Sequence, residues 1–478
     1  MKYYWTRFLT SYPKTLTYML QSSDYKIEDY HKWLARSGDF RKIAKRRELN
    51  YTNKAKLILL ALRLVAVVFY LFSILVVSYS IYTSNALAAV LGGALLVICP
   101  LIIAYIVALP LWVGEILIQK PKQKKLIAEA SQILANHPGL KIAIAGSYGK
   151  TTAKEILKTV LSAGRKVAAT PGNMNTPIGI SRFAKTLTGK EEILIIELGE
   201  GKIGDVRELC ELAHPDIGVI TGINEAHLES FGTIENTVST IFEIQDYLVD
   251  KPIYKNKESE LVAGRIQEGD QLAYSRDGVN GWKIHKVDIG INGVTFEVKK
   301  GSENIIAYTG LLGRHNLGIL AAAISIADSL GFSPAQIASG LEETEPFEHR
   351  MHPKLMDGAW IIDDTYNGNS EGVKAGLALL EEIDAKRRIY ITPGLVEQGE
   401  KNQEVHENIG RQIAEVADVV VLMKNSVTDY IKKGLDDGGF AGQLMIVDDP
   451  LDFYKNLDKF VASGDVVLMQ NDWTDNYA

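Results

Sequence analysis

An uninterrupted apolar segment near the start of the chain constrains the fold more than any other feature. Residues 57–81 read LILLALRLVAVVFYLFSILVVSYSI, in which Arg63 is the one charged residue. A helix of about 25 residues is long enough to cross a hydrocarbon core of roughly 30 Å. A second apolar run covers residues 86–118, and neither run has the polar face that a helix of a soluble protein usually keeps. Both runs are therefore expected to cross a membrane.

Basic residues flank the two runs and predict their topology. One basic cluster precedes the first run and another follows the second, whereas residues 82–85 between them carry no charge. Because Lys and Arg are enriched on the cytoplasmic side, both clusters are expected there, which requires an even number of crossings. We predict a transmembrane helical hairpin over residues 56–119, with both termini in the cytoplasm. Residues 1–55 form a basic segment that either lies on the membrane surface or folds as a small separate cap.

The composition of the whole chain resembles that of a soluble multidomain protein. The chain has 478 residues, a net charge of -6 and a mean hydropathy of +0.01, which averages an apolar hairpin with a polar remainder. This length predicts two or three domains. The mild acidity argues against a nucleic-acid partner. Cys99 and Cys210 are far apart and predict neither a disulfide framework nor a cysteine zinc site.

A glycine loop with a lysine follows a short apolar strand. Residues 142–145 read IAIA, and a helical pattern occupies residues 154–161. The backbone N–H groups of such a loop bind phosphate, while the lysine reaches the terminal phosphates and the next hydroxyl serves Mg²⁺. Ile144 stands where the usual pattern has its first glycine, and the alternative is a glycine turn with a solvated lysine. The predicted phosphate-binding residues are Gly146, Ser147, Tyr148, Gly149, Lys150, Thr151 and Thr152.

Two further buried strands are expected to end beside this loop. The apolar runs 192–196 and 217–221 lead into Glu197 and His227, and helical patterns separate all the runs. This alternation predicts a doubly wound parallel sheet, in which ligands bind beyond the carboxyl ends of the strands. Lys150, Glu197 and His227 should therefore converge, with the carboxylate and the imidazole suited to hold Mg²⁺. The alternatives are that Glu197 caps a helix and that His227 is a surface residue.

The rest of the chain predicts a strand-rich insertion and a second α/β domain. Residues 261–312 alternate polar and apolar side chains, and short strands separated by helices follow Pro346. The expected fold class is α/β. A P-loop, doubly wound central domain covers residues 120–345, and a Rossmann-like C-terminal domain covers residues 346–478. A cleft is expected between the two domains.

Six stretches of sequence resemble, in the same order, the motifs of the Mur ligase family. They are GSYGKTT at 146–152, TPGNMN at 170–175, ELG at 197–199, AHLESFG at 226–232, GRHN at 313–316 and DDTYN at 363–367. The similarity is greatest to the branch that adds D-alanyl-D-alanine to a UDP-linked muramoyl tripeptide. It implies an ATP-dependent acid–amino-acid ligase of peptidoglycan biosynthesis, which the predicted hairpin would hold at the bacterial cytoplasmic membrane. In such an enzyme an amine attacks an acyl phosphate that is formed on a carboxylate.

The resemblance also implies roles for individual residues. Lys150 and Thr151 would hold phosphates and Mg²⁺, and Glu197 and His227 would hold metal ions. Asn316 would contact the adenine, while Arg350 and Asp364 would complete the nucleotide site from the C-terminal domain. The implied partners are ATP, Mg²⁺, a muropeptide precursor that is UDP-linked or lipid-linked, and an amino acid or dipeptide amine.

Three departures from the family pattern keep other functions open. The hairpin takes the place of the UDP-binding domain, and Ile241 stands where many relatives carbamylate a lysine. Residues 470–473 read QNDW where Lys-Gly-Ser is expected. The alternatives are a ligase for another peptide-like acid and a membrane-tethered nucleotide-binding protein without ligase activity.

Four residues on expected C-terminal loops either line the amine pocket or serve as helix caps and surface residues. They are Tyr366, Asn367, Glu397 and His406.

Overall fold

The computed structural model describes residues 3–23, 25–37, 39–40, 49–224, 231–366, 368–395 and 401–471. The chain divides into two compact units, Met1–Lys125 and Leu126–Ala478. Each unit has a hydrophobic core of its own.

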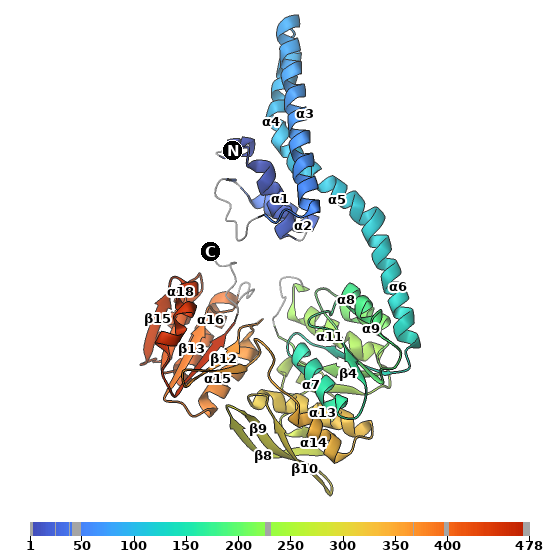
Figure 1. Ribbon diagram of the computed structural model, residues 1–478, viewed down its shortest axis with the longest axis vertical. Coiled ribbons are helices and arrows are strands. Elements are labelled where there is room, and N and C mark those ends of the chain that lie inside the picture. The colour runs from blue at the N-terminus through green and yellow to red at the C-terminus, as the bar shows by residue number, and fades with distance from the viewer. Residues whose placement is uncertain are drawn as a thin grey trace. The chain divides into compact units, whose positions relative to one another are not determined.

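The N-terminal unit consists of short helices followed by a helical hairpin. Its elements are η1 (Tyr4–Phe8), α1 (Tyr12–Ser22), α2 (Ile27–Arg36), α3 (Asn53–Thr83), α4 (Ala86–Ile106), α5 (Ala108–Gly114) and η2 (Glu115–Gln119). Thr52 and Asn85 cap α3 and α4, because each side-chain oxygen accepts the N–H group three residues later at 3.2 Å. The two helices run side by side (Figure 1). A Cβ atom at Gly92 would lie 2.7 Å from Val77 Cγ2, so glycine permits their close contact.

By length and composition, two helical segments of the described chain could cross a membrane. They are Asn53–Thr83 and Ala86–Asn136, the second of which runs from α4 into α6 (Lys120–Asn136). Pro100 lies inside α4 without ending the helix. The short N-terminal helices share one hydrophobic core with the hairpin, formed by residues such as Leu16, Tyr30, Leu62 and Ile103.

The central domain is built on a parallel sheet, as predicted, which has six strands in the order β2-β3-β1-β4-β5-β6. The strands are β1 (Leu140–Ala145), β2 (Val167–Ala169), β3 (Ile193–Glu197), β4 (Ile217–Ile220), β5 (Ile253–Asn256) and β6 (Ala273–Tyr274). One face packs on α7 (Lys150–Ser162), α13 (Leu317–Ser329) and α14 (Pro334–Glu342). The other face packs on α6, α8 (Pro177–Ala184), α9 (Asp205–Ala213) and α11 (Ile234–Tyr247). Helices on both faces explain why the central strands are apolar throughout.

The predicted insertion is an antiparallel sheet in the order β10-β9-β8-β7. It begins later than the sequence pattern indicates, because α12 (Glu260–Ala263) and β6 precede it. Its strands are β7 (Gly278–Val279), β8 (Trp282–Gly290), β9 (Gly293–Lys300) and β10 (Glu303–Thr309). The three-residue helix η3 (Arg314–Asn316) then leads into α13.

The C-terminal domain is a second α/β sheet in the order β11-β12-β16-β13-β14-β15. The strands are β11 (His352–Met356), β12 (Ala359–Asp364), β13 (Arg387–Thr392), β14 (Val419–Met423), β15 (Gln443–Val447) and β16 (Asp465–Gln470). The helices are α15 (Ser370–Glu382), α16 (Asn402–Val416), α17 (Thr428–Asp437), α18 (Pro450–Lys455) and α19 (Leu457–Phe460). The short strands predicted after Pro346 are present, and β11 is an antiparallel edge strand. Because β16 lies between β12 and β13, the order reverses there, which is where such sheets bind ligands.

Candidate active site

The glycine loop between β1 and α7 is fixed by the end of β4. Gly146 has φ 149°, and a Cβ atom there would lie 2.1 Å from Thr221 Oγ1, so a side chain is excluded. The Thr221 hydroxyl donates to the Tyr148 carbonyl at 2.5 Å, and the Ser147 N–H donates to the Gly222 carbonyl at 2.7 Å. These contacts hold the loop in front of the first turn of α7, whose N–H groups have no partner within the helix.

Two features of this loop fit a phosphate group. Ser147 Oγ is buried and has no hydrogen-bond partner among the described residues, so it can donate to a phosphate oxygen. Lys150 begins α7 and lines the adjacent cavity. Ile144 is a fully buried residue of β1, so it does not disturb the loop that starts two residues later.

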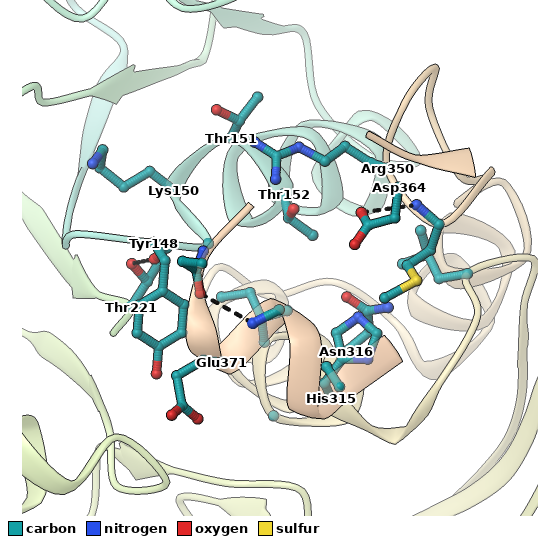
Figure 2. A pocket seen from close by; sticks show the side chains of 18 of the residues that line it. Tyr148, Lys150, Thr151, Thr152, Thr221, His315, Asn316, Arg350, Asp364 and Glu371 are labelled. Carbon is teal, nitrogen blue, oxygen red and sulfur yellow. Dashed lines mark hydrogen bonds between the residues drawn. The ribbon is translucent and has the colours of Figure 1, made fainter. Parts of the chain in front are cut away.

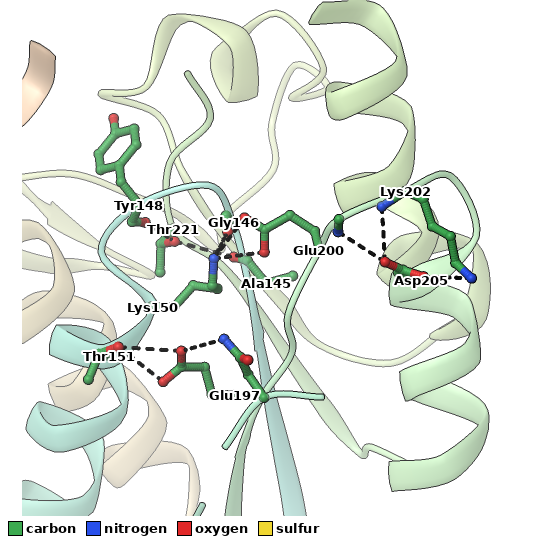
Figure 3. A network of polar contacts seen from close by, with 12 residues as sticks. Ala145, Gly146, Tyr148, Lys150, Thr151, Glu197, Glu200, Lys202, Asp205 and Thr221 are labelled. Carbon is green, nitrogen blue, oxygen red and sulfur yellow. Dashed lines mark hydrogen bonds and ion pairs between the residues drawn. The ribbon is translucent and has the colours of Figure 1, made fainter. Parts of the chain in front are cut away.

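The ammonium group of Lys150 is paired with a buried carboxylate. Lys150 Nζ lies 2.7 and 2.9 Å from the two oxygens of Glu200 and also donates to the Gly146 carbonyl (Figure 3). The Glu200 side chain is almost completely buried. A phosphate that binds Lys150 therefore has to displace the Glu200 carboxylate from its ammonium group. The sequence motifs gave no indication of Glu200.

Glu197, at the end of β3, sits in a compact polar cluster. Its carboxylate accepts hydrogen bonds from the Thr151 hydroxyl at 3.2 and 3.3 Å and from Asn175 Nδ2 at 3.1 Å. It also pairs with the fully buried Lys154, whose Nζ is 3.1 Å away. A carboxylate next to a hydroxyl at the end of a phosphate loop is a donor set that suits Mg²⁺. Lys154 was missed from the sequence, although it follows Lys150 by one helical turn.

A cavity of about 650 Å³ connects the phosphate loop to the C-terminal domain. Figure 2 shows Arg350 and Asp364 on the opposite side of it from Lys150. It brings together ten of the twelve predicted residues, namely Ser147, Tyr148, Gly149, Lys150, Thr151, Thr152, Glu197, Asn316, Arg350 and Asp364. Gly146 shapes the loop without lining the cavity, and His227 lies outside the described residues. The volume suits a ligand of nucleotide size.

Asp364 is held at the carboxyl end of β12 by polar contacts. Burial raises the pKa of its carboxyl group to about 6, although Gln470 Nε2 donates to it at 2.8 Å and the charge of Arg350 favours ionisation. The Arg350 guanidinium lies over the Tyr366 ring, 5.0 Å from its centre. This side of the cavity thus carries a guanidinium beside a carboxyl group whose pKa is raised to about 6.

Gln470 replaces an expected lysine and joins three elements of the C-terminal domain. In addition to Asp364, its amide nitrogen donates to the Gly372 carbonyl at 2.6 Å, and its oxygen accepts from the Tyr390 hydroxyl at 2.8 Å. Asn471 follows it and donates to the Thr392 hydroxyl at 3.2 Å. The departure from the family pattern therefore supplies neutral amides to the framework of the site.

Asn316 and Tyr366 lie on the cavity wall, whereas His406 does not. Asn316 Nδ2 donates to the Leu312 carbonyl at 2.8 Å. His406 is fully buried, and its Nε2 accepts the Leu395 N–H at 2.9 Å, so it stabilises a loop. Burial also lowers the pKa of its imidazole. Asn367 and Glu397 lie outside the described residues.

Ile241, on helix α11, stands where many relatives have a lysine, and it cannot bind a metal ion. Ile241 is completely buried in the hydrophobic core. The nearby carboxylate of Glu243 accepts the N–H groups of Gly204 and Arg207, both at 2.9 Å, and so caps the start of α9.

Family models match both domains that form the cavity. The Mur ligase middle domain matches residues 144–327, and the Mur ligase, glutamate ligase domain matches residues 349–470. The hairpin precedes both matches.

Relatives with known names are similar over the same region. The UDP-N-acetylmuramoyl-tripeptide--D-alanyl-D-alanine ligase of Bacillus subtilis is 28% identical over 275 residues, which are 57% of this chain and 60% of the relative. The enzyme of that name from Mycobacterium tuberculosis is 30% identical over 300 residues, which are 60% of this chain and 58% of the relative. The chain thus spans about three fifths of the length of these relatives.

Solved structures share the fold. The MurF ligase from Thermotoga maritima in complex with ADP has a TM-score of 0.63 at 26% identity, covering 73% of this chain and 80% of that chain. MurF from Acinetobacter baumannii has a TM-score of 0.64 at 21% identity, covering 73% and 77%. With two matched domains in this order around one cavity, the chain belongs to the Mur ligase family.

Proposed function

We propose that this protein is an ATP-dependent amide ligase that acts on a carboxylate of a cell-wall muropeptide precursor. The observation that carries the proposal is the single cavity in which Lys150, Thr151 and Glu197 lie opposite Arg350 and Asp364. The amine is of the D-alanyl-D-alanine type, as the names of the relatives suggest.

The chemistry requires mainly positioning and charge neutralisation. A carboxylate oxygen of the acceptor attacks the γ-phosphorus of ATP, the bond to the β,γ-bridging oxygen breaks, and ADP leaves. The amine then attacks the acyl carbon, inorganic phosphate leaves, and the nitrogen loses a proton as the amide forms. Mg²⁺, when bound, neutralises charge on the phosphate oxygens.

The residues of this chain divide the binding of ATP among them. The loop N–H groups, Ser147 and Lys150 hold the phosphates, while Thr151 and Glu197 hold Mg²⁺. Asn316 contacts the adenine from the start of α13. Arg350 neutralises phosphate charge from the opposite wall, and Asp364 orients Arg350. We also assign His227 to the metal, on the basis of its family motif alone.

We further propose that the hairpin spans the bacterial cytoplasmic membrane and holds the catalytic domains on the cytoplasmic side. The apolar residues of α3 are largely exposed, for example Leu57 at 67% and Ile81 at 76%, as lipid-facing side chains are. The family matches begin after the hairpin, at residue 144. A lipid-linked muropeptide, which lies in the same membrane, is therefore the preferred acceptor.

ADP release and product mass measure the proposed activity. The full-length protein is incubated with ATP, Mg²⁺, D-alanyl-D-alanine and either UDP-linked or lipid-linked muropeptide. We expect a product heavier by the dipeptide minus water, and its absence in Lys150→Ala. An Asp448→Asn variant is the matched control, since Asp448 pairs with Lys424 on the surface. If ATP binds but no acceptor and amine pair increases ADP release, the protein is a nucleotide-binding protein without ligase activity. The buried Ile241 is the observation that favours this second function.

A further inference from the structure

Three tyrosines from three N-terminal helices donate hydrogen bonds to backbone carbonyl groups of α4. The pairs are Tyr4–Val97, Tyr12–Pro100 at 3.3 Å and Tyr30–Ala104 at 2.9 Å. Acceptors that are three and four residues apart lie on one face of a helix. The short helices are thus attached along one side of the hairpin. Helix η1 lies nearest the turn between α3 and α4, and α2 lies nearest the opposite end, which we call the base of the hairpin.

These contacts place η1 within the apolar length of the hairpin. The acceptor of Tyr4 is residue 97, which is about 16 Å along α4 from its first residue, Ala86. The exposed apolar surface of α3 continues past this level to Leu57. A hydrocarbon core is about 30 Å thick, so a hairpin that crosses it carries η1 into the cytoplasmic leaflet.

The exposed surface of η1 has the chemistry that this depth requires. Trp5 and Phe8 of η1 are 51% and 43% exposed, and Tyr3, which directly precedes the helix, is 39% exposed. Arg7 is the one charged residue of η1, and its guanidinium lies 5.1 and 5.2 Å from the centres of the Tyr4 and Phe40 rings. The aromatic surface thus covers this charge.

Helix α2, nearer the base of the hairpin, is different. Its surface carries the exposed pair Glu28 and Lys32, 2.9 Å apart, so it suits water and headgroups. Figure 1 shows these N-terminal helices beside the lower part of α3 and α4. The change from an aromatic to a charged surface follows the same direction as the attachment points on α4.

The charge of the segment complements an anionic membrane surface. Residues 1–63 contain 14 Lys and Arg residues against five Asp and Glu residues, whereas the whole chain has 52 against 58. The rest of the chain is therefore acidic on balance, although a second basic cluster, residues 120–125, follows the hairpin. An anionic membrane surface attracts the basic N-terminal segment.

We propose that η1 is a membrane-inserted wedge, in which Tyr3, Trp5 and Phe8 contact acyl chains of the cytoplasmic leaflet, while basic residues at the start of α3, Lys54 and Lys56, bind anionic headgroups. This inference rests on the proposed crossing of the hairpin. It assigns to the N-terminal segment a partner, the lipid of one leaflet. In addition to α3 and α4, the wedge is a third element in contact with lipid, and this contact fixes the depth and tilt of the hairpin in the membrane.

Fluorescence quenching by brominated lipid tests the wedge. The full-length protein is reconstituted in vesicles of phosphatidylethanolamine and phosphatidylglycerol that contain phosphatidylcholine with brominated acyl chains. We expect the tryptophan emission that the brominated lipid quenches to be smaller in Trp5→Phe than in the wild type. In Trp360→Phe, a substitution in the C-terminal domain, this quenched emission should be unchanged. Phe8→Asp should reduce the quenching of Trp5 by about twofold or more, because a carboxylate resists insertion. Lys32→Asp on α2 should leave this quenching unchanged.

Two results would overturn the inference and separate it from the proposed function. If Trp5→Phe loses no quenched emission while the protein resists extraction with alkaline carbonate, the hairpin crosses the membrane and the wedge is wrong. If carbonate extracts the protein, the membrane crossing fails together with the wedge, and ligation in detergent remains open to the assay of ADP release.

Discussion

Lys150, at the end of the phosphate loop, and Glu200, in the segment after β3, form an ion pair of 2.7 Å, although 50 residues separate them in sequence. The Glu200 carboxylate is bound to the ammonium group of Lys150, which a nucleotide phosphate is expected to contact. Binding of ATP therefore exchanges one anion for another on the same ammonium group, and the strength of the first pair sets part of the affinity for the second.

Removing the charge of Glu200 should strengthen nucleotide binding. In Glu200→Gln the amide competes less well than a carboxylate for Lys150, so we expect the Kd for ATP to fall by roughly three- to tenfold. Isothermal titration calorimetry of the full-length protein measures this change, with Asp448→Asn as the control. An unchanged or weaker affinity would show that Glu200 does not compete with the phosphates.

Lys154 should be essential for the stability of the central domain. Lys154→Met leaves the buried Glu197 carboxylate without its cation, which costs about 3–5 kcal/mol of unfolding free energy. Lys158→Met on the same helix removes an exposed pair with Glu155 and should change stability by less than about 0.5 kcal/mol. Urea denaturation followed by fluorescence measures both, and equal losses in the two variants would contradict the buried pairing.

Stability should depend on the ionisation of Asp364. Its folded pKa of about 6 lies above the ordinary value of 3.8, so the folded state prefers the protonated carboxyl group. The resulting stabilisation is complete below the ordinary pKa and is lost as the pH rises through about 6. The neutral amide of Asp364→Asn does not titrate, so the unfolding free energy of the variant should rise relative to that of the wild type by about 3 kcal/mol as the pH rises through this range. Unfolding free energies at a series of pH values measure this difference, and two parallel profiles would exclude the shift.

Gly92 should be required for the hairpin, whereas its neighbour should not. A leucine at Gly92 meets Val77 of the opposite helix at 2.7 Å from its Cβ atom, so we expect Gly92→Leu to separate α3 from α4. A Cβ atom at Gly93 meets nothing within 4 Å, which makes Gly93→Leu the matched control. Cysteine pairs introduced across the two helices should cross-link in the control and lose about tenfold in rate in Gly92→Leu. Equal rates would contradict the packing.

The parts of the fold that the sequence predicted are those in which one local pattern decides the structure. The runs 142–145, 192–196 and 217–221 contain apolar residues because helices cover both faces of their sheet, and they are β1, β3 and β4. The phosphate loop is predictable for a similar reason, because its glycines adopt positive φ angles that other residues rarely adopt. Placing a carboxylate at the end of β3 then followed from the topology of parallel sheets.

The polar partners in the site could not be predicted in the same way. Glu200 looks like an ordinary loop residue, and Lys154 looks like a solvated helix residue, until the fold buries both. Gln470 meets Asp364 across 106 residues of sequence. His406 is polar and near a loop, yet it is buried as an acceptor for a backbone N–H group. Such pairings depend on the positions of whole elements rather than on any period in the sequence.

The position of β16 imposes an order of assembly on the protein. This strand is synthesised after β15, but it pairs with β12 and β13 near the middle of the C-terminal sheet. Until it arrives, β12 and β13 lack their common neighbour, and Asp364 lacks the amide of Gln470. The hairpin at the other end leaves the ribosome long before. The nucleotide site is therefore incomplete until β16 is made, so ATP cannot engage the full site during translation.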